Sequence, residues 1–198
     1  ALAMKLKTAS YNVKYFLPKF NRLEAIVGIQ GIDQTNTNFG EELLIPDANV
    51  KDFGTFLTAN YAWKSNVLQA GIRYDNRKIN TQTHGIIGEE GYFEAIDKQF
   101  DSFNASVGYK TDLSESINSR INIASGFRAP NLSELTSNGV HEGSNRYEIG
   151  DSNLKNEQNF QVDLNLEYKS QHFEIFVNGF YNHINNYIYI TPTGAEID

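Results

Sequence analysis

The sequence of 198 residues contains no cysteine, so neither a disulfide framework nor a thiolate metal site is possible within it. It also lacks any run of roughly 18 consecutive apolar residues, the length that a membrane-spanning helix requires. Basic residues are scattered singly in a chain of net charge -7, so we expect no nucleic-acid partner. These absences do not exclude a membrane barrel, because alternating strands cross a bilayer with only about half of their residues apolar.

Sequence signatures of catalysis are also missing. The chain has no nucleophile elbow, no HExxH motif, no phosphate-binding glycine loop and no Cys–His pair. The acidic pairs Glu41-Glu42 and Glu89-Glu90 are not tied by spacing to another acid. The four histidines do not have the spacing of metal ligands. We therefore expect a protein that is not an enzyme and that has no metal site and no cofactor.

What the sequence does contain is alternation with a period of two residues. In one stretch Ile117, Ile121 and Ile123 fall on one parity, while Asn118 and Arg120 fall on the other. The same pattern predicts an all-β, antiparallel up-and-down meander of about eight long strands, near residues 5–17, 22–32, 52–64, 66–76, 99–110, 116–128, 157–169 and 172–190. Such a sheet is part of a transmembrane β-barrel or closes as one.

The predicted connections alternate between short and long. Tight turns fall near residues 18, 65, 113 and 170, whereas long polar loops cover 33–51, 77–98 and 129–156. Compact domains usually have connections of about 4–6 residues. Outer-membrane barrels have short periplasmic turns at one end and long extracellular loops at the other, and the pattern is typical of them.

Aromatic residues on the apolar parity lie near both ends of the predicted strands, with smaller aliphatic residues between them. We predict that ten of them lie at the membrane interfaces: Tyr15, Trp63, Tyr109, Tyr168 and Phe173 beside the short turns, and Phe53, Tyr74, Phe127, Phe160 and Tyr181 toward the long loops. A soluble sandwich places its bulkiest groups centrally. The alternative is a soluble all-β binding or structural module that uses its long loops for recognition.

One long stretch resembles a known family. The barrel of TonB-dependent outer-membrane receptors is similar to this chain in the segments Gly126-Phe127-Arg128-Ala129-Pro130-Asn131-Leu132-Ser133-Glu134-Leu135, Asn138-Gly139-Val140-His141, Arg146-Tyr147-Glu148-Ile149-Gly150-Asp151 and Asn153-Leu154-Lys155. Asn156 stands where the family pattern often has proline. The family's barrel has about 22 strands around an N-terminal plug, so the resemblance implies a barrel fragment without its plug.

The resemblance also implies a function. It implies the barrel portion of a receptor that imports a scarce ligand, such as a ferric siderophore, haem or cobalamin, across the outer membrane of a Gram-negative bacterium. The implied partners are the lipid bilayer, the plug domain of the parent chain, the TonB energy-transducing complex and a small-molecule or metal-chelate ligand. An open sheet of eight strands has two unpaired edges, so the fragment is also expected to self-associate unless it closes.

Five loop residues are candidates for contact with that ligand. Arg128 and Arg146 are suited to an anionic group, which a guanidinium binds bidentately, although pairing within the protein is an equal alternative. His141 is a candidate polar contact. Tyr147 and Phe93 are candidates for stacking on a planar ligand, with packing inside their own loops as the alternative.

Overall fold

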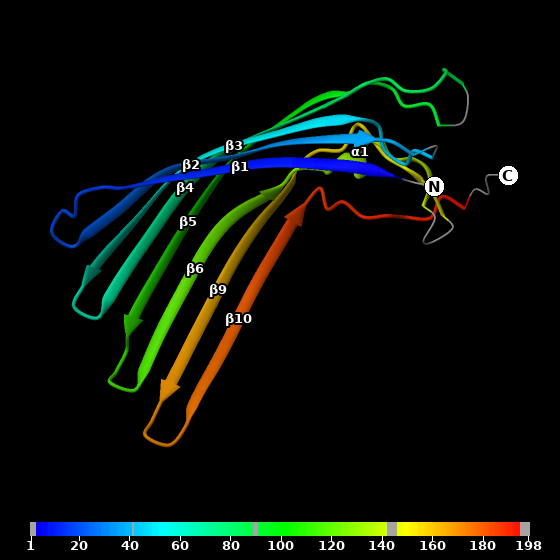
Figure 1. Ribbon diagram of the computed structural model, residues 1–198. Helices are drawn as coiled ribbons and strands as arrows, with labels where there is room; N and C mark the ends of the chain where they lie inside the picture. The colour runs from blue at the N-terminus through cyan, green and yellow to red at the C-terminus, as the bar shows by residue number, and fades with distance from the viewer. Residues whose placement is uncertain (1–2, 41, 89–90, 142–145, 195–198) are drawn as a thin grey trace.

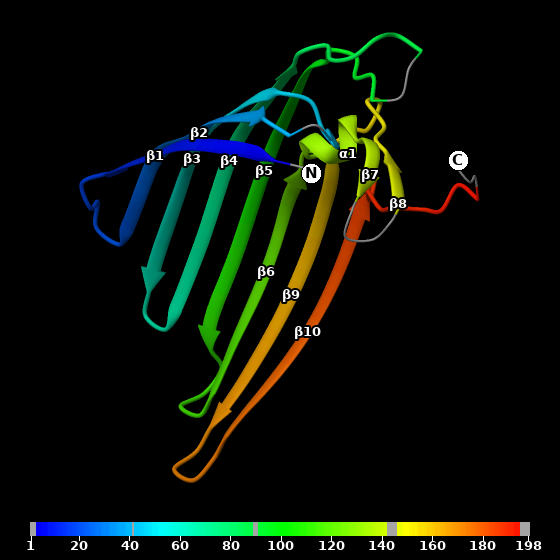
Figure 2. The ribbon, with the colours of Figure 1, turned by 45° about the vertical axis from the view of Figure 1, so that its right-hand side comes forward.

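Eight strands of the computed structural model form one antiparallel sheet (Figure 1). The structure describes residues 3–40, 42–88, 91–141 and 146–194. The eight strands of the sheet are β1 (Met4–Phe16), β2 (Leu23–Asn38), β3 (Ala48–Trp63), β4 (Asn66–Thr81), β5 (Asp97–Asp112), β6 (Ile117–Arg128), β9 (Glu157–Lys169) and β10 (Glu174–Asn185). They lie side by side in chain order, which confirms the predicted meander. Within the described residues the sheet is a curved trough that does not close, because β1 and β10 pair on one side only (Figure 2).

Several strands extend further than the sequence pattern indicated. β2 continues to Asn38, β3 begins at Ala48 and β4 ends at Thr81, whereas the alternation placed these ends near 32, 52 and 76. The ladder continues through polar residues there, as at Thr35, whose hydroxyl donates to Asn49 Oδ1 at 3.0 Å. The outer parity of each strand becomes polar in these extensions, and the apolar residues Ala48, Val50 and Ile79 lie on the opposite parity, so the alternation that marks the rest of the strands could not reveal them.

The last strand is shorter than predicted. β10 ends at Asn185, not near 190, and the next residue, Asn186, has φ 54°. This left-handed conformation, which asparagine adopts more readily than most residues, ends the extended chain. The segment that follows is therefore free to cross toward the start of β9.

The predicted loop 129–156 has secondary structure of its own. It contains the short helix α1 (Leu132–Thr136) and a hairpin of β7 (Asn138–His141) and β8 (Arg146–Ile149). All long connections gather at the end of the sheet opposite the tight turns (Figures 1 and 2). No helix among the described residues is long and apolar enough to cross a membrane.

The two faces of the sheet differ in chemistry. We call the face that carries Leu57, Ile72, Ile121 and Leu164 the outer face, and the opposite face the inner face. In the strand ladder Leu57 lies directly opposite Ile72, and Ile121 lies directly opposite Leu164. The aromatic residues beside the tight turns form one row on this face, and those toward the long loops form a second row. Between these two aromatic rows no outer-face side chain of the eight strands carries a charge. The inner face is polar over most strands, although β10 places Phe176 and Phe180 on it.

Little apolar surface is buried within the chain itself. The core is one cluster on the inner face at the loop end, formed by Ile79, Phe100, Ala129 and Leu135. The outer-face aliphatic and aromatic side chains are instead exposed on nearly every strand. A contiguous apolar surface of this extent marks contact with a membrane or another protein.

The neighbouring strands β5 and β6 separate toward the loop end. Their ladder runs only from Ser106 paired with Ala124 to Asp112 paired with Asn118. Beyond it, Ser125 Oγ accepts from the Ala105 N–H at 2.9 Å, and Asn156 Nδ2 donates to Asp101 O at 3.0 Å. Side chains thus replace the backbone ladder where β6 turns away and leads into α1.

Candidate functional site

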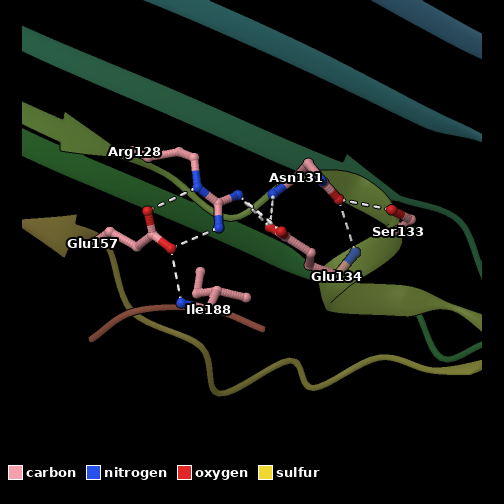
Figure 3. A network of polar contacts seen from close by, with 6 residues as sticks. All are labelled: Arg128, Asn131, Ser133, Glu134, Glu157 and Ile188. Atoms are coloured by element: carbon pink, nitrogen blue, oxygen red, sulfur yellow. Dashed lines mark hydrogen bonds and ion pairs between the residues drawn. The ribbon is translucent and has the colours of Figure 1, made fainter. Parts of the chain in front are cut away.

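The most connected polar group at the loop end is the guanidinium of Arg128, the last residue of β6 (Figure 3). Its Nε and Nη2 donate to the two carboxylate oxygens of Glu157 at 2.9 and 2.8 Å. Its Nη1 donates to both oxygens of Glu134 at 2.8 Å. Bidentate, charge-assisted hydrogen bonds of this kind are among the strongest in proteins. Arg128 therefore holds the start of β9 and helix α1 together.

The local sequence explains why Glu134 is in position. Asn131 caps α1, and its side chain accepts from the Glu134 N–H at 2.8 Å. In return, Glu134 Oε2 accepts from the Asn131 N–H at 2.9 Å, which completes a capping box. Leu135, the next residue, is buried in the core cluster and fixes the helix against the inner face. The carboxylate of Glu134 is thus oriented from both sides before it meets Arg128.

Glu157 joins a further segment to this network. Its Oε1 also accepts from the Ile188 N–H at 2.7 Å, so the chain after β10 is tied to the start of β9 (Figure 3). Asn186 Nδ2 supports the same contact by donating to Asn156 O at 3.1 Å. The side chain of Glu157 is only 10% exposed, so its charge depends on these donors.

A hollow of about 540 Å³ borders this network along the inner part of β1 to β4 and reaches Phe127, Arg128 and Ala129. Two further arginines line it, and each is paired. Arg77 donates to both oxygens of Asp52 at 2.6 Å, and Arg73 donates to Asp75 while lying 5.8 Å from the centre of the Phe56 ring.

These pairs determine what the hollow can do chemically. Its guanidinium donors are engaged by carboxylates, so an anionic ligand has to exchange with an internal partner. Within the described residues no group of three or more histidine, aspartate or glutamate side chains is arranged to hold a metal ion. The arrangement is that of a polar wall that orders loops and offers exchangeable hydrogen bonds.

Asn138, at the start of β7, links the three long loops to one another. Its N–H donates to Leu44 O at 3.2 Å, and its side-chain Nδ2 donates to Tyr92 O at 2.9 Å. Its Oδ1 accepts from the hydroxyl of Tyr147 at 2.8 Å. The hairpin is therefore attached to both other loops and not suspended alone.

The structure separates the five candidate ligand residues into three places. Arg146 and Tyr147 lie on β8, where the Arg146 guanidinium is 3.6 Å from the Glu148 carboxylate. His141 lies opposite Arg146 in the hairpin ladder, and its side chain is outside the described part of the chain. Arg128 lies in the inner network, paired within the protein.

Phe93 takes the third place. Its side chain is 3% exposed and packs within its own loop, with its ring centre 6.5 Å from that of His84. The ring offers no open face for stacking in this arrangement, as expected from the alternative of packing inside the loop.

The predicted interface aromatics lie mostly on the exposed outer face. Trp63 is partly buried and lies between Tyr61 and Tyr109, with ring centres 5.4 and 6.1 Å away. The exposed members are Tyr15, Phe53, Tyr74, Tyr109, Phe160, Tyr168, Phe173 and Tyr181. Phe127 differs, because it packs against the core cluster where β6 turns away from β5.

Sequence reasoning missed the partners of these residues. Glu134, Glu157, Asn138 and Asp52 were not singled out, although each completes a contact described above. The spacing Asn131-x-x-Glu134 is a capping-box signature, so this pair was detectable in advance. Glu157 and Asn138 meet their partners through register and loop folding, for which a single sequence gives no local signal.

Comparisons with known proteins agree with this architecture. A family model described as "TonB dependent receptor-like, beta-barrel" matches residues 7–198. Three solved structures with similar folds are the copper transporter OprC, the FrpB iron transporter from Neisseria meningitidis, and the hemophore receptor HasR from Serratia marcescens in complex with its hemophore HasA and heme.

The likeness to these structures is one of fold. OprC is 15% identical over 94% of this chain, with a TM-score of 0.73. FrpB is 16% identical over 97%, with a TM-score of 0.70, and HasR is 13% identical over 94%, with a TM-score of 0.75. The chain spans about a third of their length, with 31%, 30% and 34% of each covered.

Proposed function

Because this chain belongs to the TonB-dependent receptor-like β-barrel family, we propose that it forms part of the barrel wall of an importer in the outer membrane of a Gram-negative bacterium. The imported ligand is a scarce nutrient, such as a ferric siderophore, haem or cobalamin. The family consists of receptors and transporters, not enzymes. The observation that carries the proposal is the outer-face band, which has no charge between two aromatic rows on eight consecutive strands.

The proposal assigns a different environment to each face. The outer face contacts lipid, because residues such as Val27, Leu57 and Ile72 are exposed and have no cover within the described chain. The polar inner face, with Arg73 and Asp75, faces the lumen and the plug domain of the parent receptor, which in turn engages the TonB energy-transducing complex. A soluble module leaves the same apolar band in water, so we do not favour that alternative.

The two edges of the sheet fit a larger barrel. Within the described residues β1 and β10 each leave one edge of backbone groups without a strand partner. We propose that further strands of the receptor pair with them, and that the isolated chain self-associates through the same edges.

Ligand contact is proposed for the β7–β8 hairpin. His141, Arg146 and Tyr147 lie on this hairpin, which Asn138 attaches to the other loops. We do not assign ligand contact to Arg128 or Phe93. Arg128 orders the loops by binding carboxylates of the protein, and the side chain of Phe93 is buried. Loops on a rigid scaffold are the usual place for recognition.

The test is uptake by cells that depend on the full-length receptor. Cells that lack it are complemented with the wild-type receptor or with an Arg146→Ala, Tyr147→Ala variant, and radiolabelled ferric siderophore, haem or cobalamin is supplied at limiting concentration. We expect the wild type to restore uptake of one ligand and the double variant to reduce it about tenfold, the effect of losing a charged hydrogen bond.

The matched control is Glu115→Ala, in a tight turn at the opposite end of the sheet, which is expected to leave uptake unchanged. Equal uptake with and without the receptor for all three ligands contradicts the proposed import. Recovery of the receptor in the soluble fraction contradicts the membrane location.

A further inference from the structure

Three lysines form a strip on the outer face, just beyond the aromatic row nearest the long loops. Lys51 on β3 lies two residues beyond Phe53, and Lys78 on β4 lies four beyond Tyr74. Lys7 lies at a similar level on β1. Two to four strand residues span about 7–14 Å along a tilted strand. The lysine strip is therefore at the depth of the lipid head groups, which flank the hydrocarbon core by about 5–8 Å on each side.

The ladder brings two of these charges together. Lys51 and Lys78 are direct partners on neighbouring strands, where like charges destabilise a sheet. Their side chains project on the same face. An arrangement of this kind calls for an anion close to both ammonium groups.

Acidic residues nearby compensate only part of this charge. Asp33 lies 3.4 Å from Lys51 Nζ, but the two side chains are 55% and 64% exposed. The carboxylate of Asp101 is already engaged by Tyr74 Oη at 2.5 Å, Asn76 Nδ2 at 2.7 Å and Gln99 Nε2 at 3.1 Å.

Lys78 makes no direct ion pair in the part of the chain that the structure describes, but its ammonium group is attracted electrostatically by the carboxylate of Asp101. Asp97, the other outer-face acid on β5, lies two residues further from the bilayer than Gln99 and opposite Asn80. Asp33 and Asp101 thus oppose the three lysines, and the lysine strip keeps one excess positive charge at this level, in a chain whose net charge is -7.

We propose that the lysine strip binds the phosphate groups of anionic lipids in the surrounding leaflet. A lysine ammonium is a compact point charge with three donors, and it binds phosphate in this way at membrane surfaces. The aromatic row below the strip, including Phe53 and Tyr74, sets the depth of the barrel so that the phosphates meet the lysines. This inference rests on the proposed function, since it requires that the outer face lies in a bilayer.

The experiment compares lipid retention by the full-length receptor in native mass spectrometry. The probes are lipid A, a diphosphorylated glycolipid, and phosphatidylcholine, with inorganic phosphate as a soluble competitor. We expect Lys51→Gln, Lys78→Gln to reduce lipid A retention about tenfold or more, because each lysine near a phosphate-bearing surface contributes on the order of 1 kcal/mol. Retention of phosphatidylcholine is expected to stay unchanged.

The matched control is Lys14→Gln, Lys110→Gln, which removes two inner-face lysines and is expected to leave lipid A retention unchanged. An equal loss in this control, or no loss in the outer-face variant, overturns the lysine strip as a lipid site. Displacement of lipid A by an equimolar amount of inorganic phosphate overturns it in favour of a soluble anion. Failure of the wild type to insert into phosphatidylcholine vesicles overturns the membrane function itself and is a separate result.

Discussion

At the scale of single residues, Arg128 makes the largest number of charged contacts in the described loop region. It joins β6 to Glu157 on β9 and to Glu134 on α1, and Glu157 in turn holds the N–H of Ile188. One guanidinium thus connects segments that are far apart in sequence. The sequence marked Arg128 as a residue for a carboxylate or an anionic ligand, but only the folded loop identifies its partners.

We predict that Arg128→Gln loosens these segments together. The variant leaves the nearly buried Glu157 carboxylate without its main donor, at a cost of about 2 kcal/mol. In hydrogen–deuterium exchange of the full-length receptor, protection at the Ile188 amide and at the α1 amides is expected to fall roughly 30-fold.

Arg120→Gln on the same strand is the control, because Arg120 is exposed on the inner face. Exchange at α1 and Ile188 is expected to stay at the wild-type rate in this variant. Unchanged exchange in Arg128→Gln would show that the network does not hold the loops.

At the scale of elements, the positions of the strands follow directly from the alternation of apolar and polar residues. The outer-face residue Ile121 was placed on the apolar parity by sequence, and the ladder pairs it with Leu164 on β9. The short helix α1 and the β7–β8 hairpin were not predicted, since five and four residues are too few for a clear periodicity. Their positions depend on the core contact of Leu135 and on hydrogen bonds between loops, which exist only after the sheet has formed.

We predict that the two faces of β9 respond oppositely to an introduced arginine. Leu164 lies midway between the aromatic residues Phe160 and Tyr168 on the outer face. Leu164→Arg is expected to destabilise the barrel by about 2–4 kcal/mol, the cost of a guanidinium near the bilayer midplane. Urea unfolding of the full-length receptor folded into lipid vesicles measures the difference.

Gln161→Arg is the matched variant on the inner face of the same strand. Gln161 already donates to Asp163 at 2.8 Å, and an arginine there retains a carboxylate partner. Its unfolding midpoint is expected to stay near that of the wild type. Equal destabilisation by both substitutions would contradict the assignment of lipid to one face only.

At the scale of the whole molecule, the chain is a sheet whose apolar surface faces outward. Its core on the inner face is small, whereas exposed outer-face side chains extend over all eight strands. The sequence predicted an apolar surface on the outside of the sheet, because aromatic residues such as Tyr74 and Tyr168 lie near both ends of the strands. It could not predict the curvature of the trough or the separation of β5 from β6, because both arise from strand pairing along the whole sheet.

Oxygen accessibility along β4 tests the central claim, a lipid-facing outer face, most directly. Because the 198 residues contain no cysteine, single cysteines can be introduced for spin labels at positions 68–73 of the receptor in bilayers. We predict that labels at Leu68, Ala70 and Ile72 are accessible to lipid-soluble oxygen and shielded from a water-soluble nickel chelate. Labels at Gln69, Gly71 and Arg73 are expected to be shielded from oxygen. Equal access to the chelate on both parities would contradict the account.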